Sequence, residues 1–259
     1  MTAPTDPPAA GRLLLVPNTL DLGADETPLQ DVLPAGVIEH AAGLTHWVVE
    51  NARSARAFLK RVDALSPLAQ PLQALSIREL PRPRKGSGAE VPDAEWDALL
   101  EPARQGQDLG LLSEAGLPAV ADPGAALVAR AHRSGLDVVP LSGPSAIVLA
   151  LAASGLNGQS FAFVGYLPQD AQARTARLRE LEAQSRRWRQ TQLCIETPYR
   201  NAALFDAMLA ALAPETRLSV SCGLTLQGGF TRTATVAQWR HAGLAWPQRL
   251  PAVFALLAA

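Results

Sequence analysis

The 259 residues are 48% apolar and 18% charged, a composition that excludes general intrinsic disorder and suits one large domain or two modest ones. The longest apolar runs, such as residues 147–153, are far shorter than the roughly 18–20 residues that a membrane span requires. Two cysteines, and a proline-rich start without an apolar leader, predict a cytoplasmic protein with no disulfide or metal framework.

Charge is distributed unevenly along the chain. Residues 1–141 carry 12 Lys and Arg against 18 Asp and Glu, whereas residues 142–259 carry 11 against 6. The second part, with its net charge of +5, is therefore suited to hold an anionic substrate. Mutual attraction of two domains, or drift without function, explains the asymmetry equally well.

The first part alternates between predicted strands and helices. Runs of apolar residues bounded by turn residues predict strands at residues 12–16, 45–50, 75–80, 109–112 and 136–141. Helical spacing predicts helices at residues 52–62, 93–104 and 124–134. Asp122 and Pro123 are expected to cap the last of these helices, and residues 82–92 are expected to form a Pro- and Gly-rich loop.

A second pattern begins near residue 142. Strands are predicted at residues 161–164, 191–196, 218–222 and 253–257, with a hairpin around Gly228 and Gly229. Helices are predicted at residues 143–154, 169–189 and 199–213, the last one capped by Thr197 and Pro198. The alternation predicts the α/β class, as two α/β domains at residues 12–141 and 142–259, because the charge sign and the strand pattern both restart there.

Several common catalytic motifs are absent from the sequence. It contains no P-loop, no complete GxGxxG, no HExxH, no GxSxG and no paired CxxC, and the GSG at residues 86–88 is a weak match to a dinucleotide site. Its four histidines are scattered, so they indicate structural or solvated side chains rather than a metal site.

Two glycine-bearing turns at predicted strand ends are the informative segments, SEAGLP at 113–118 and SGPSA at 142–146. Ligands of open α/β sheets bind beyond the carboxyl ends of strands, and glycine lets the backbone approach a ligand closely. SGPSA also begins a predicted helix, whose free N–H groups favour an anion. Either turn alone is better explained as a simple connection between strand and helix, whereas the two together favour a ligand site.

The segment from 111 to 156, together with GYLP at 165–168 and IETPYR at 195–200, resembles the tetrapyrrole-methylase-like S-adenosylmethionine methyltransferases. The similarity is greatest to the branch that methylates a cytidine 2′-hydroxyl in small-subunit ribosomal RNA. The resemblance implies an S-adenosyl-L-methionine-dependent methyltransferase of two α/β domains with a cofactor cleft between them. It also implies a homodimer and an RNA substrate, without a membrane or a metal.

Residue by residue, the resemblance implies three groups of site residues. The cofactor-binding positions are Ser113, Ala115, Gly116, Pro118, Gly143, Pro144, Ser145, Ala146 and, more weakly, Leu224. The substrate-binding positions are Asn18, Arg53, Tyr199 and Arg200. Candidates for a general base, or another catalytic role, are Glu50, Glu114 and Glu196, and a capping or ion-pair role is the alternative for each of them.

The chain departs from the family pattern at several positions. An aspartate is replaced by Glu114, a threonine by Leu117 and a second aspartate by Asn51, while SCGLTL at 221–226 lacks the charges of its counterpart. PNTLDLGAD at 17–25 lacks a central glycine. The substrate is therefore rRNA, another polar molecule or a tetrapyrrole, and a non-catalytic cofactor-binding paralogue is the alternative.

Arginines at 174, 177, 179, 186, 187 and 189 follow one predicted helix, and Arg82, Arg84 and Lys85 lie in a loop earlier in the chain. They are suited to contact phosphates, although a solvated helix face is the favoured interpretation. Trp188 is the one aromatic residue among them, so stacking on unpaired bases has little support from the sequence.

Overall fold

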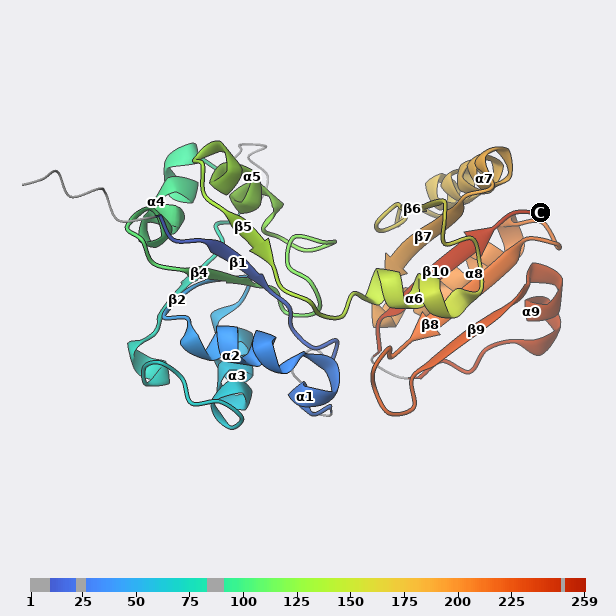
Figure 1. The fold of residues 1–259 in the computed structure, drawn as a ribbon. Helices are drawn as coiled ribbons and strands as arrows, with labels where there is room; N and C mark the ends of the chain where they lie inside the picture. The colour runs from blue at the N-terminus through green and yellow to red at the C-terminus, as the bar shows by residue number, and fades with distance from the viewer. Residues whose placement is uncertain (1–9, 22–26, 83–90, 248–249) are drawn as a thin grey trace, which may run out of the picture. The chain divides into compact units, whose positions relative to one another are not determined.

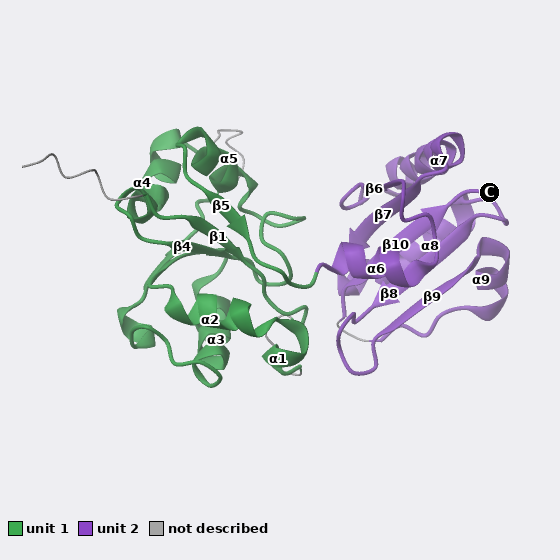
Figure 2. Ribbon diagram, in the orientation of Figure 1, with its two compact units in different colours: residues 1–144 green, residues 145–259 purple. Residues whose placement is uncertain are grey.

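The computed structural model describes residues 10–21, 27–82, 91–247 and 250–259 (Figure 1). Most of the expected leader, and the GSG loop with Arg84 and Lys85, lie outside these residues. The chain forms two compact units, residues 1–144 and 145–259 (Figure 2). This division falls three residues beyond the boundary that the sequence predicts.

Unit 1 contains a five-stranded sheet in which every pairing is parallel, with the strand order β3-β2-β4-β1-β5. Its strands are β1 (Leu13–Val16), β2 (His46–Val49), β3 (Ser76–Glu79), β4 (Leu109–Leu112) and β5 (Val138–Pro140). Because the strands are parallel, their carboxyl ends share one edge of the sheet. The turns after β1, β2, β4 and β5 therefore lie along that edge.

Helices cover both faces of this sheet (Figure 1). They are α1 (Leu29–Val32), α2 (Ala35–Gly43), α3 (Ala52–Asp63), α4 (Asp93–Arg104) and α5 (Ala125–Arg133), with a 3-10 turn at Leu72–Ala74. Strand side chains alternate between the faces, so Leu14 packs with α1 to α3 and Leu13 packs with α4 and α5. Helices α1 and α2 were not among the predicted elements.

The predicted cap of α5 is wrong. Gly124 precedes the helix with φ +121, and no side chain caps it. Leu111 Cδ2 lies 3.0 Å from the position that a Cβ on Gly124 would take, so the chain enters the helix where there is little room for a side chain. Asp122 is consequently not the N-cap of α5 that the sequence predicts.

Unit 2 contains a second five-stranded sheet, with the order β6-β7-β10-β8-β9. Its strands are β6 (Phe161–Phe163), β7 (Thr191–Glu196), β8 (Arg217–Cys222), β9 (Phe230–Thr235) and β10 (Ala252–Leu257). Only the β6–β7 pairing of this sheet is parallel. The predicted hairpin is confirmed, because residues 223–229 connect β8 to the antiparallel β9.

The helices of unit 2 are α6 (Ala146–Ser154), α7 (Ala171–Trp188), α8 (Asn201–Ala211) and α9 (Val236–Ala242), with a 3-10 turn at Pro198–Arg200. Helices α7, α8 and α9 pack on one face of the sheet, and α6 packs on the other. The predicted N-terminus of α6 at Gly143 is wrong, since Ser145 caps it. The Thr197 side chain does not cap α8 either, because the 3-10 turn precedes that helix.

Within the described segments, no helix combines the length and the apolar character that crossing a membrane requires. The same residues contain no group of three or more His, Cys, Asp or Glu side chains arranged to hold a metal ion. Cys194 and Cys222 are buried and unpaired, and burial raises the pKa of the Cys194 thiol to about 12, so it stays protonated.

Candidate functional site

The turn after β4 is held by Asn18, which follows β1. Asn18 Nδ2 donates to the carbonyl oxygens of Ser113 and Glu114 at 3.2 and 3.1 Å, and its Oδ1 accepts from the Thr19 N–H at 2.8 Å. The residue is 5% exposed, and both polar atoms of its side chain hydrogen-bond to other groups of the protein. Asn18 thus positions the SEAGLP turn, and the contact with substrate that the resemblance implies for it stays a prediction.

Two backbone N–H groups of the SEAGLP turn already donate hydrogen bonds within the protein. The Glu114 N–H donates to Glu50 Oε2 at 3.1 Å, and the Gly116 N–H donates to the Thr19 carbonyl at 3.2 Å. The amides of Ala115 and Leu117 make no hydrogen bond with any residue that the structure describes. These two N–H groups are therefore available to a ligand.

Ser113 supplies a second available group at the same turn. The residue is 3% exposed, and its Oγ has no hydrogen-bond partner among the described residues. A buried hydroxyl without a partner costs free energy, so native structures rarely retain one without a reason. This atom, one residue beyond β4, fits a ligand that supplies the missing partner.

Two glycines make the turns compact. Gly116 has φ +67, a left-handed conformation that other residues adopt only with strain. A Cβ on Gly116 would lie 3.4 Å from the Pro144 carbonyl oxygen, so the SEAGLP turn and the beginning of SGPSA are neighbours within unit 1. A Cβ on Gly143 would lie 2.3 Å from Pro17 Cβ, which leaves no room for a side chain there.

A pocket of about 420 Å³ adjoins the turn within unit 1. Its described lining contains Asn18 and Glu114 from the strand ends and, from α3, Ser54, Lys60 and Arg61, among others. A volume of this size lies at the lower end of the range for small-molecule sites. Pro118, also in the turn, is buried and does not line it.

Asp122 is a candidate that the sequence analysis treated only as a cap. Burial raises the pKa of its carboxyl to about 7, and the negative charges of Glu50 and Glu114 act in the same direction. The charges of Glu50 and Glu114 thus act on Asp122 near the carboxyl edge of the sheet. The signal available in the sequence was that Asp122 lies in the same connection as Glu114, between the strand at 109–112 and the next helix.

Asn51 and Arg53 lie at the start of α3. Asn51 Oδ1 accepts from the backbone N–H groups of Arg53 and Ser54 at 2.9 and 3.4 Å, which makes Asn51 the cap of the helix. The Arg53 side chain is exposed. The replacement of the family's aspartate by Asn51 therefore keeps a side-chain oxygen at the cap.

The remaining implied cofactor positions lie in unit 2. Ser145 Oγ accepts from the Val148 N–H at 3.5 Å, and Ala146 begins α6, whose first amides have no partner within the helix. Leu224 lies in the turn between β8 and β9 and packs partly buried against the apolar cluster under α6. Its contacts within the unit are those of a packing residue.

Glu196 is buried at the end of β7 and is already paired. Its Oε1 accepts from the Thr197 N–H at 2.8 Å, and its Oε2 lies 2.7 Å from Arg200 Nη2. The Oε2–Nη2 contact is an ion pair, but its angles do not meet the geometry of a hydrogen bond. Tyr199, between them in the chain, is 81% exposed. The structure thus brings Glu196 and Arg200 together and leaves Tyr199 in solvent.

The carboxyl edge of a parallel sheet is where open α/β proteins bind their ligands, and in unit 1 this edge carries the available backbone and hydroxyl groups. Residues 43–238, which are 196 of the 259, match the family described as Tetrapyrrole (Corrin/Porphyrin) Methylases. The chain belongs to this family.

Relatives include the proteins named Ribosomal RNA small subunit methyltransferase I. The Vibrio cholerae protein is 38% identical over 127 residues, 49% of this chain and 43% of its own length. The Mesorhizobium japonicum protein is 39% identical over 138 residues, 53% of this chain and 46% of its own length. The chain therefore spans less than half the length of these relatives.

Solved structures with the same fold include uroporphyrin-III-C-methyltransferase from Thermus thermophilus, with a TM-score of 0.51 and 19% identity, covering 95% of this chain and 92% of that one. The methyltransferase CobJ gives a TM-score of 0.58 at 15% identity, covering 96% and 95%. These similarities confirm the predicted α/β fold class.

Proposed function

We propose that the protein is an S-adenosyl-L-methionine-dependent methyltransferase whose cofactor binds at the SEAGLP turn. The single observation that carries this proposal is the unpartnered, buried Ser113 hydroxyl beside the available amides of Ala115 and Leu117. Family membership supports the choice of ligand. We further propose that Gly143, Pro144, Ser145 and Ala146 contact the cofactor from the second turn.

The bound cofactor would supply an activated methyl group on a sulfonium. The chain's own contribution is chiefly alignment, which can lower a barrier by about 7–11 kcal/mol. Asn18, Glu50 and Thr19 provide it by fixing the turn with five hydrogen bonds: two from the Asn18 side-chain amide, one from the Asn18 backbone N–H to the Gly116 carbonyl, and one each at the Glu114 and Gly116 N–H groups. A turn held in this way can present the Ala115 and Leu117 amides without reorganising.

A hydroxyl substrate, such as a ribose 2′-hydroxyl of rRNA, benefits from a general base. Glu114 and Asp122 are the better-supported candidates, because Glu50 Oε2 accepts a backbone hydrogen bond and Glu196 faces Arg200. A carboxyl with a pKa near 7, as Asp122 has, is suited to accept a proton at neutral pH. The proposed substrate class is rRNA or another polar molecule, and the proposed assembly is a cytoplasmic homodimer without a metal.

The test replaces Ser113 by alanine and measures S-adenosylmethionine binding by calorimetry. We expect binding to weaken about threefold to tenfold, because one hydrogen bond is lost. The folded protein should keep or gain stability, because a buried polar atom without a protein partner disappears.

The matched control is Ser219→Ala in unit 2. Ser219 Oγ is also buried without a partner among the described residues, and the residue is 1% exposed. It should have the same effect on stability and none on cofactor affinity. Equal cofactor affinity in both variants and the parent protein would contradict the proposed site. No binding of S-adenosylmethionine or S-adenosylhomocysteine to the parent protein would contradict the proposed cofactor, whereas binding without methyl transfer would favour the non-catalytic cofactor-binding paralogue.

A labelled-methyl assay distinguishes the substrate classes. Transfer to small ribosomal subunits supports the rRNA proposal, and transfer to uroporphyrinogen supports a tetrapyrrole methylase.

The best sequence argument for a non-catalytic paralogue was Asn51, and that argument weakens because Asn51 performs the capping that an aspartate would perform.

A further inference from the structure

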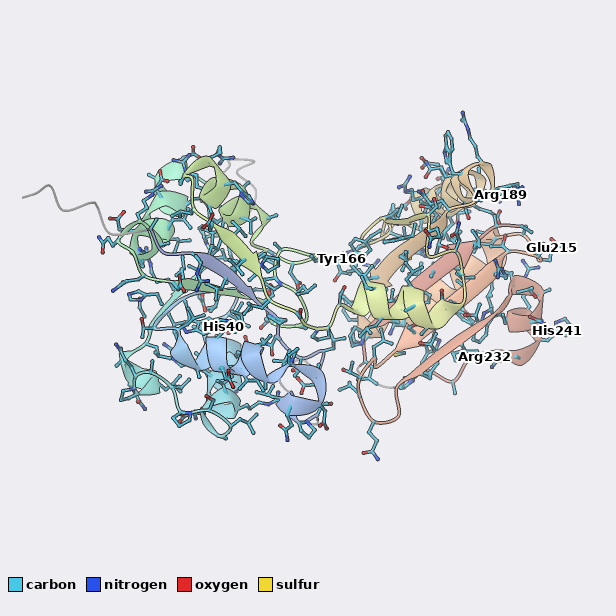
Figure 3. The ribbon with its side chains drawn as sticks, in the orientation of Figure 1. His40, Tyr166, Arg189, Glu215, Arg232 and His241 are labelled. Carbon is cyan, nitrogen blue, oxygen red and sulfur yellow. The ribbon has the colours of Figure 1, made fainter. Side chains whose placement is uncertain are left out.

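The end of α7 in unit 2 presents an exposed aromatic ring among arginines. Trp188 is 60% exposed, and the Arg187 guanidinium carbon lies 4.7 Å from the centre of its ring. Arg189 follows in a left-handed conformation with φ +48 and is labelled in Figure 3. We refer to Arg187, Trp188 and Arg189 as the α7 patch.

The backbone of the α7 patch is fixed. The Arg189 carbonyl oxygen accepts from Asn157 Nδ2 at 2.6 Å, and Asn157 Oδ1 in turn accepts from the Gln159 N–H at 2.9 Å. The patch therefore ends a long helix at an anchored point rather than in a free loop. Because this backbone is already ordered, binding a ligand to its side chains costs less conformational entropy than binding to a free loop.

The guanidinium groups of the patch are not neutralised. Arg177, earlier in α7, forms an ion pair with Glu180 at 2.6 Å, and Arg186 donates to the Ala259 carbonyl. Among the described residues, no carboxylate forms an ion pair with Arg187 or Arg189. By contrast, the unit 1 residues Arg104 and Arg130 are both paired with Asp97. The patch thus keeps its charge available in the unit with the positive net charge.

We propose that the α7 patch binds single-stranded RNA, with Arg187 and Arg189 on phosphates and Trp188 stacked on an unpaired base. An exposed ring beside unpaired arginines is the combination that such strands require, since phosphates need cations and every base has a face to stack on. The proposal rests on the proposed function only in the choice of RNA as substrate. It revises the expectation that these arginines form a solvated helix face.

A role in helix stability and a role at a membrane are the competing hypotheses for the α7 patch. Arginines at the C-terminus of a helix also interact favourably with the helix dipole. If that were their only role, their replacement would change protein stability alone. A basic patch with one tryptophan could also contact an anionic membrane. RNA is favoured because α7 exposes no second large apolar side chain beside the ring, so it has no apolar face to insert into lipid.

The experiment measures the binding of a short, unstructured, fluorescein-labelled RNA by anisotropy at several salt concentrations. Replacing both Arg187 and Arg189 by alanine should lower the slope of log affinity against log salt by about 1.4, or about 0.7 for each lost contact with a single strand. Trp188→Ala should weaken binding about 5- to 150-fold, and Trp188→Phe should restore most of it because stacking survives.

Arg133→Ala is the matched control. Arg133 is exposed and ends α5 in unit 1, so it has the same relation to a helix dipole without a neighbouring aromatic ring. Its loss should leave the salt slope unchanged. Equal RNA binding by the patch variants and the parent protein would overturn the proposal, as would binding of the parent protein to phosphatidylserine vesicles but not to RNA.

Calorimetry with S-adenosylmethionine separates this proposal from the proposed function. Patch variants should bind the cofactor as the parent protein does. If the parent binds the cofactor while the RNA result is negative, the patch fails and the methyltransferase proposal stands. If no cofactor binds, the anisotropy measurement still decides the patch, because it contains no cofactor.

Discussion

At the scale of single residues, folding changes the ionisation of the Asp122 carboxyl strongly. Its pKa rises from an ordinary 3.8 to about 7 on folding, first through burial and then through the charges of Glu50 and Glu114. Between these two pH values the folded state keeps a proton that the unfolded state releases. The free energy of unfolding should therefore fall as pH rises from about 4 to about 7.

Asp122→Asn should remove this dependence. We expect the variant to be more stable than the parent protein at pH 8 and equal to it near pH 4, as measured by thermal unfolding at both pH values. Asp206→Asn, at an exposed position on α8, should change neither value. An identical difference between variant and parent at both pH values would show that Asp122 ionises normally in the folded protein.

At the scale of one element, the first turn of α3 explains a departure from the family pattern. Asn51 caps the helix through its side-chain oxygen, and Glu79 Oε1 accepts from the Ala52 N–H at 2.8 Å, so the side chains of both residues provide partners for free amides of the helix. The position demands an acceptor, which asparagine and aspartate both supply.

Asn51→Ala should therefore cost about 0.5–2 kcal/mol of unfolding free energy, and Asn51→Asp should retain parent stability. Urea unfolding of the two variants provides the measurement. If the aspartate variant were as unstable as the alanine variant, the amide of Asn51 would have a role that the cap does not explain.

At the scale of the whole molecule, each unit contains its own sheet and its own apolar clusters. The clusters that contain Trp47 and Leu100 lie in unit 1, and those that contain Trp239 and Val253 lie in unit 2. The two units contain 144 and 115 residues, which are ordinary lengths for domains. The partition into two domains is thus a proposal that can be tested directly.

We expect residues 1–144 and 145–259, expressed separately, each to unfold cooperatively in urea when followed by far-ultraviolet circular dichroism. A separately expressed unit with no cooperative transition would mean that it needs the other for its stability. The parent protein provides the reference for the native secondary structure of both.

The sequence alone determined the strands and most of the helices, because alternation and helical spacing are local. Leu109–Leu112, Asp93–Arg104 and Thr191–Glu196 have the predicted bounds. Helix α2 was missed although Val37, Ile38, Ala41 and Ala42 have helical spacing, since no cap residue marks its start at Pro34. The glycine-bearing turns were likewise recognisable from their residues.

Tertiary structure decided which groups of those turns are available. Asn18 and Glu114 are 96 residues apart, and Glu50 and Glu114 are 64 apart, so no local pattern predicts that they bond. Which amides a turn can offer, and whether Ser113 has a partner, depends on what parallel strands bring to one edge of the sheet. Hydrogen bonds and burial between distant segments follow from packing, whereas the sequence specifies only the residues that are packed.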